Sequence, residues 1–88
     1  MAAGVTYRVA FAIGAAAQFH DLPERARDAL VHLAADLAER PWDGVTVLPP
    51  GDNPAFREAV FGNGHGLLAV HVNDVAELVR IFNIVWLE

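Results

Sequence analysis

The 88-residue chain contains no cysteine and no lysine. Without cysteine it can form neither disulfide bonds nor thiolate metal sites. Its six basic residues are all arginine and stand against eleven acids, which leaves a net charge of −5. Affinity for nucleic acid that comes from many phosphate contacts needs clustered basic side chains. The sequence shows no such cluster, so a nucleic-acid-binding protein of that kind is not expected.

Long hydrophobic runs are also missing, although 55% of the residues are hydrophobic. A membrane-spanning helix needs roughly 18 consecutive apolar residues, whereas the excess here is mainly alanine and valine. The first residues lack the basic stretch followed by an apolar stretch that marks a targeting signal. We therefore expect a cytoplasmic protein without membrane contact. The length suffices for one hydrophobic core, which predicts a single domain over residues 1–88.

The first half of the chain predicts a strand followed by a helical hairpin. Residues alternate in character over Thr6–Ile13, as in a half-buried strand, and Gly14 is expected to break it. The alanine-rich segment Ala15–His20 predicts a short helix. A second helix is expected over Pro23–Arg40, because proline suits a first helical turn. Apolar residues spaced by three or four positions give this helix one stripe for packing on a sheet: Ala26, Leu30, Leu33 and Leu37.

The second half of the chain predicts the rest of a sheet. The turn-rich segment Pro41–Pro54 has room only for a short edge strand at Val45–Leu48. Further strands are expected at three places separated by a glycine loop and an Asn-Asp turn: Phe56–Phe61, Leu67–Val72 and Glu77–Leu87. The fold class is therefore α+β, with an N-terminal strand, a helical hairpin and then a three- to four-stranded antiparallel sheet.

The segment Glu77–Leu87 is apolar on both sides of a regular strand. A helical hairpin covers only one face of a sheet, so the other face needs a partner molecule or the Pro41–Pro54 segment folded over it. We expect the partner. Strict alternation assigns the two faces as Leu78, Phe82, Ile84 and Trp86 on one, and Val79, Ile81, Val85 and Leu87 on the other.

Three stretches, Tyr7–Phe11, Leu22–Pro41 and Phe56–Asp74, resemble the opening strand, the helical hairpin, and the Arg-strand, glycine loop and strand of the RelE/ParE superfamily of bacterial toxins. The resemblance implies the toxin of a type II toxin–antitoxin system, which inhibits growth and is neutralised when a cognate antitoxin wraps its sheet and helices. It leaves two targets open: translation, through ribosome-dependent mRNA cleavage, and DNA gyrase. The gyrase mode needs no catalytic residues.

Cleavage of RNA without a metal needs a base, an acid and a cation that stabilises the transition state. Superfamily RNases use lysine and arginine for much of this chemistry, and in a chain without lysine only histidine and arginine remain. We predict Arg57 and Arg80 as phosphate contacts and His71 or His65 as the proton-transfer group. No metal and no cofactor are predicted.

Four further residues are candidates for binding the antitoxin or another partner. Tryptophan is common at interfaces, although core packing explains it equally well here, and a polar residue in an apolar strand needs a hydrogen-bond partner when buried. The candidates are Trp42, Phe82, Asn83 and Trp86. An alternative function is a catalytically silent protein-binding module on the same fold, such as a homodimer formed through the uncovered sheet face.

Overall fold

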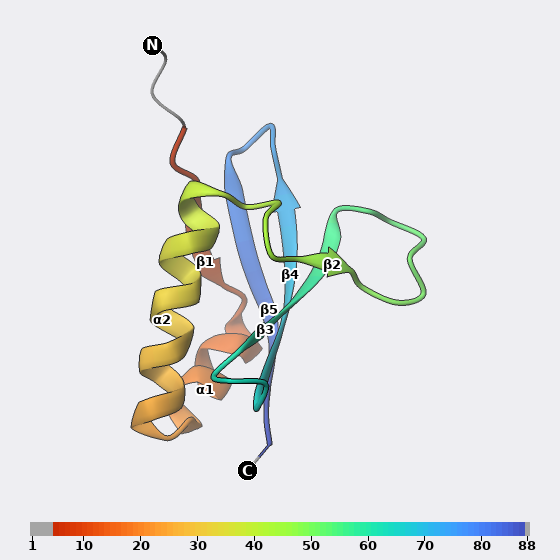
Figure 1. Cartoon of the computed structure of the whole chain (residues 1–88). Coiled ribbons are helices and arrows are strands. Elements are labelled where there is room, and N and C mark those ends of the chain that lie inside the picture. Colours follow the sequence, from red (N-terminus) through yellow and green to blue (C-terminus); the bar gives the residue numbers. More distant parts are fainter. Residues whose placement is uncertain (1–4, 88) are drawn as a thin grey trace.

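A five-stranded sheet carries both helices on one of its faces in the computed structural model, which describes residues 5–87 (Figure 1). The strand order is β1-β5-β4-β3-β2. β1 pairs with β5 in parallel, and all other pairs are antiparallel. The predicted α+β fold is confirmed. The elements are β1 (Arg8–Phe11), α1 (Ile13–Asp21), α2 (Glu24–Glu39), β2 (Thr46–Val47), β3 (Phe56–Phe61), β4 (Gly66–Asn73) and β5 (Leu78–Trp86).

The junction of β1 and α1 lies earlier in the chain than predicted. The Ala12 N–H donates to the Ile81 carbonyl at 2.8 Å, so the backbone still follows β5 there. The Ala12 carbonyl already accepts from Ala16 N at 3.0 Å, which begins the helix. Ile13 and Gly14, predicted as the strand end and its break, therefore form the first turn of α1.

The second helix has the extent and the buried stripe that the sequence predicts. Pro23 is its N-cap and Arg40 its C-cap. Ala26, Leu30 and Leu37 are buried, and Leu33 packs partly buried against the same core. The hydrophobic core therefore lies between this stripe and the sheet, where it includes side chains of three neighbouring strands: Phe61, Leu68, Val70, Val79 and Ile81.

A β-bulge interrupts the regular alternation of β5. Val70 pairs with Ile81 and Ala69 pairs with Asn83, so Phe82 is an extra residue without a partner position on β4. An extra residue shifts the inside–outside pattern of everything after it by one position. As a result the helix-facing side chains of β5 are Val79 and Ile81 before the bulge, and Ile84 and Trp86 after it.

The predicted assignment of faces along Glu77–Leu87 is therefore wrong. Strict alternation placed Ile84 and Trp86 on the side opposite Val79 and Ile81, but both pairs pack against the helix-side core. The sequence pattern cannot reveal the shift, because the two alternating sets of side chains in this strand are equally apolar. The conclusion that one face of the sheet lacks helical cover still holds, since α1 and α2 both lie on the same side (Figure 1).

We call the face of the sheet opposite the helices the open face. The connection between β2 and β3 forms an open loop that projects away from the helices (Figure 1). Val60, Leu67 and Val85 on the open face remain 61%, 37% and 38% exposed. The alternative that the Pro41–Pro54 segment covers the face is therefore wrong for these residues.

Candidate functional site

Three rows of side chains cross the open face from β3 through β4 to β5. The strand register aligns each row, because residues paired across neighbouring strands point to the same side of a sheet. The first row is apolar and exposed, the second is mixed, and the third holds an aromatic ring, an imidazole and a guanidinium. The rows are Val60, Leu67 and Val85; Glu58, Ala69 and Asn83; and Phe56, His71 and Arg80.

The third row is the part of the open face with residues suited to proton transfer and charge stabilisation. His71 is paired with Arg80 on β5 and with Phe56 on β3. The Phe56 ring lies 4.7 Å from the His71 ring and 5.5 Å from the Phe82 ring, between centroids. The bulge brings Phe82 to this side. His71 is half-buried beside these rings, while Arg80 is exposed to solvent.

Arg57, the other predicted phosphate contact, lies on the opposite face. It pairs with Val70, which is completely buried beneath the helices. Its guanidinium stacks on the Trp42 ring, 5.0 Å from the centroid, and its Nε donates to the Pro54 carbonyl at 2.7 Å. The hypothesis that Arg57 and Arg80 face one site is therefore not supported by the register.

His65 lies in the tight turn that joins β3 to β4, far from the third row. Its Nδ1 is 3.1 Å from the Leu87 carbonyl oxygen, which can only accept a hydrogen bond, so Nδ1 carries the proton. The ring lies 5.7 Å from the Trp86 ring between centroids. Of the four predicted catalytic residues, the structure brings together His71 and Arg80.

The predicted partner-binding residues do not form one surface. Phe82 and Asn83 lie at the bulge on the open-face side, whereas Trp86 packs on the helix side, 5.7 Å from the Phe61 ring between centroids. Asn83 has its polar partner within the chain, because Gln18 Nε2 donates to its Oδ1 at 2.9 Å. A bound partner is therefore not needed to satisfy the Asn83 side chain.

Trp42 belongs to a small hydrogen-bonded cluster beyond the C-terminal end of α2. Trp42 Nε1 and the Tyr7 hydroxyl both donate to Asp74 Oδ1, at 2.9 and 2.7 Å. The bond to Asp74, followed by burial and the charges of Asp74 and Glu77, raises the pKa of Tyr7 above its ordinary value of 10.0. Sequence reasoning missed Tyr7 and Asp74 as partners, because 67 positions separate them.

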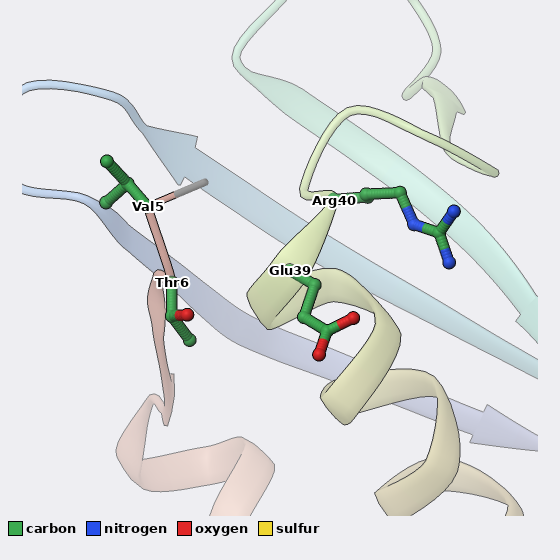
Figure 2. A pocket seen from close by; sticks show the side chains of 4 residues that line it. All are labelled: Val5, Thr6, Glu39 and Arg40. Atoms are coloured by element: carbon green, nitrogen blue, oxygen red, sulfur yellow. The ribbon is translucent and has the colours of Figure 1, made fainter. Parts of the chain in front are cut away.

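A shallow hollow of about 360 Å³ lies where the N-terminal segment meets the end of α2 (Figure 2). Val5 and Thr6 line one side, and Glu39 and Arg40 the other. The Arg40 guanidinium extends away from Val5 and Thr6 (Figure 2). The side chains therefore do not converge on a common point, and none of the candidate catalytic residues lines the hollow.

Within residues 5–87 no group of three histidine, cysteine or acidic side chains is arranged to hold a metal ion. No helix in this part of the chain is long and apolar enough to cross a membrane.

No protein-family model and no curated protein matches the sequence. Solved structures do match. A chain of the RelBE2 toxin–antitoxin complex from Mycobacterium tuberculosis superimposes with a TM-score of 0.81 at 26% identity, over 93% of this chain and 99% of that one. The isolated Escherichia coli RelE toxin gives 0.79 at 18% identity, over 93% and 85% of the two chains.

A third structure, the archaeal RelE–RelB complex from Pyrococcus horikoshii, gives a TM-score of 0.73 at 16% identity, over 92% of this chain and 94% of that one. At such identities the likeness establishes the fold. The three superpositions span 92–93% of this chain and 85–99% of the relatives, and they include the segments that resemble the family in sequence. The chain therefore has the fold of the RelE toxin structures.

Proposed function

We propose that the chain is the toxin of a type II toxin–antitoxin pair, acting in the cytoplasm and held inactive by a cognate antitoxin. The observation that carries the proposal is the full-length structural likeness to a chain of the RelBE2 toxin–antitoxin complex, with 99% of that chain covered. A second relative of the same fold was also solved as a RelE–RelB complex.

The open face supports the antitoxin as partner. Its apolar row is exposed, and soluble monomers rarely leave large contiguous apolar patches in water unless these bind something. Phe56 at the far end of the face is also 36% exposed. A bound antitoxin segment would remove these side chains from water and at the same time block His71 and Arg80.

The open face is compatible with two cellular targets, the translating ribosome and DNA gyrase. For mRNA cleavage on the ribosome, His71 would transfer protons and Arg80 would stabilise the charge that develops on phosphate. Against this mode stand the net charge of −5 and the absence of lysine. Inhibition of DNA gyrase asks for a protein-binding surface only, and the apolar row supplies one. Both targets belong to the proposal, and the experiment separates them.

The test is induced expression in a bacterial host with and without the neighbouring gene, scoring growth, protein synthesis and plasmid supercoiling. We expect growth arrest that the neighbouring gene relieves. Loss of translation that disappears in His71→Ala/Arg80→Ala, but persists in the control His32→Ala/Arg40→Ala, would identify RNA cleavage. Loss of supercoiling that survives both double substitutions would identify gyrase. Normal growth at high expression would refute the toxin assignment.

The apolar row also favours one alternative, a catalytically silent module that binds a protein or forms a homodimer through the open face. Val60, Leu67 and Val85 form a continuous stripe across three strands, which a second copy could cover. Sedimentation of the purified chain distinguishes the two functions. A stable, non-toxic dimer that Leu67→Gln dissociates supports the module, and a growth-arresting chain that binds the neighbouring gene product supports the toxin.

A further inference from the structure

A second hollow, unrelated to the open face, lies between the start of α2 and the β3–β4 turn. Its volume is about 300 Å³, at the lower end of the range for small-molecule sites. It lies on the helix side of the sheet near Trp86, which pairs with Gly66, whereas His71 is five residues further along β4 and points to the other side. At ~3.3 Å per residue the two sites are about 17 Å apart along the strand.

The lining of this hollow combines flat rings with a cation. The Arg25 guanidinium lies over the Trp86 ring, 5.9 Å from its centroid, and the His65 ring lies 5.7 Å from the same indole. Asn63 adds an amide, and Ala29 is too small to fill the space. Since Nδ1 of His65 donates to the Leu87 carbonyl, its Nε2 carries the lone pair and can accept a hydrogen bond from a ligand.

The walls are also preorganised. A Cβ on Gly62 would collide with the Trp86 ring, so the turn lies directly against the indole. Phe61 packs on the indole as well. The Trp86 Nε1–H is buried. Within residues 5–87 it is the one buried side-chain nitrogen or oxygen that has no hydrogen-bond partner.

We propose that this hollow, defined by Arg25, His65 and Trp86, binds a nucleotide, with the base against the His65 and Trp86 rings and the phosphate at the Arg25 guanidinium. Base–aromatic stacking and arginine–phosphate contacts are the standard means of holding a single nucleotide. Glu24 and Asp28 lie near Arg25 on α2 and reduce the local positive potential, so we expect weak binding. The nucleotide is either free or part of an RNA strand.

The experiment follows the Trp86 indole N–H signal by two-dimensional NMR of the full-length 15N-labelled chain carrying Trp42→Phe, which leaves one indole. The probes are inorganic phosphate, uridine, uridine monophosphate and a short oligouridylate. We expect saturable shifts with the monophosphate and at least roughly tenfold weaker binding of phosphate or uridine alone, since each lacks one of the two contacts. Tighter binding of the oligouridylate would identify an RNA strand as the source, and equal or weaker binding a free nucleotide.

Substitutions test whether the nucleotide binds at this hollow. Arg25→Gln should weaken uridine monophosphate binding about tenfold, since it removes a charge-assisted hydrogen bond, and His65→Gln should weaken it as well. The control Arg40→Gln, at the C-cap of the same helix and outside the hollow, should leave it unchanged. No saturable shift in the parent chain, equal binding of phosphate and monophosphate, or full binding in Arg25→Gln would overturn the proposal. Binding is measured without antitoxin or growth, so it stands or fails separately from the toxin function.

Discussion

At the scale of single residues, Gln18 fixes the β5 bulge from the side of α1. Its Oε1 accepts from the Ile84 backbone N–H at 2.8 Å, and its Nε2 donates to Asn83 Oδ1 at 2.9 Å. β1 ends at Phe11, so this stretch of β5 has no strand neighbour on that side to accept the Ile84 N–H. The glutamine side chain takes the place of the missing strand.

Replacing Gln18 by Ala should lower the free energy of unfolding by about 1–3 kcal/mol, because the part-buried Ile84 N–H is left without its acceptor. Asn83→Ala is the matched control. It removes only the exposed side-chain bond and should cost ~1 kcal/mol or less. Urea unfolding followed by circular dichroism measures both, and equal losses in the two variants would contradict the role assigned to the Ile84 bond.

Ionisation of Tyr7 should make the folded chain less stable at alkaline pH. Its pKa is raised above 10.0 in the folded chain, mainly because the neutral hydroxyl donates to Asp74. A raised folded-state pKa means that this stabilisation is complete below the unfolded-state pKa, near 10, and is lost as the pH rises through the folded-state value. The melting temperature should therefore fall as the pH is raised above about 10.

The comparison with Tyr7→Phe isolates this contribution. The variant lacks the hydroxyl, so it should be less stable than the parent at neutral pH, and the difference in melting temperature should shrink as the pH rises past the parent's folded-state pKa. Thermal melts between pH 7 and about 11.5 provide the measurement. A constant difference across this range would show that the Tyr7–Asp74 bond does not produce the pH dependence.

At the scale of elements, the β3–β4 hairpin depends on glycines that its neighbours crowd. A Cβ on Gly66 would collide with the Phe61 ring, and one on Gly62, which has φ +62°, would collide with the Trp86 ring. Gly66→Ala should therefore destabilise the fold by about 1–3 kcal/mol through overpacking. Gly14 in α1 has open space around it and no positive φ, so Gly14→Ala should be neutral or stabilise by ~0.5–1 kcal/mol.

Thermal or urea unfolding of the two alanine variants tests the hairpin directly. The Gly14 variant controls for the general loss of glycine flexibility in the unfolded chain. If Gly66→Ala were as stable as Gly14→Ala, the Phe61 ring would have to move freely, and the packing of the hairpin against Trp86 would not be as tight as described.

The elements with a clear local pattern could be predicted from the sequence, and those set by tertiary pairing could not. The stripe of α2 has the helical period, and Phe56–Phe61 is bounded by turn residues, so both were located correctly. The boundary near Ile13 was wrong, because the helix start depends on the Ala12 bond to Ile81. The bulge depends on a register between two strands that each look regular alone.

The candidate site was predictable only in part for the same reason. His71 and Arg80 lie together because β4 and β5 pair in one register. Arg57 was placed with them, but alternation along β3 puts it with the buried Ala59 and Phe61. Both alternating sets of β3 contain a phenylalanine, so the sequence does not say which set is buried. The apolar row went unnoticed because its members come from three separate strands.

At the scale of the whole molecule, side chains of the open face should contribute to the affinity for a partner but little to the free energy of unfolding. Leu67→Gln combined with Val60→Thr changes side chains that are 37% and 61% exposed. The free energy of unfolding should change by less than ~0.5 kcal/mol per substitution, whereas truncation of a central interface residue weakens binding by about 1–2 kcal/mol or more. We expect the double variant to bind the antitoxin at least roughly tenfold less tightly.

Titration calorimetry with the product of the neighbouring gene measures this affinity, and urea unfolding measures the stability. Val31→Thr is the control, because Val31 is 56% exposed on α2 and lies away from the open face. An unchanged affinity in the open-face variant, together with a loss in Val31→Thr, would move the antitoxin site to the helices.

The one-sided placement of the helices also bears on how such a chain can diverge. Folding depends on the layer between the helices and the sheet, whereas side chains of the open face rest on no second layer. Selection can therefore exchange them without endangering the core, and relatives with identities of only 16–26% keep the fold at TM-scores of 0.73–0.81. One scaffold can in this way acquire new targets through a few substitutions on a single surface.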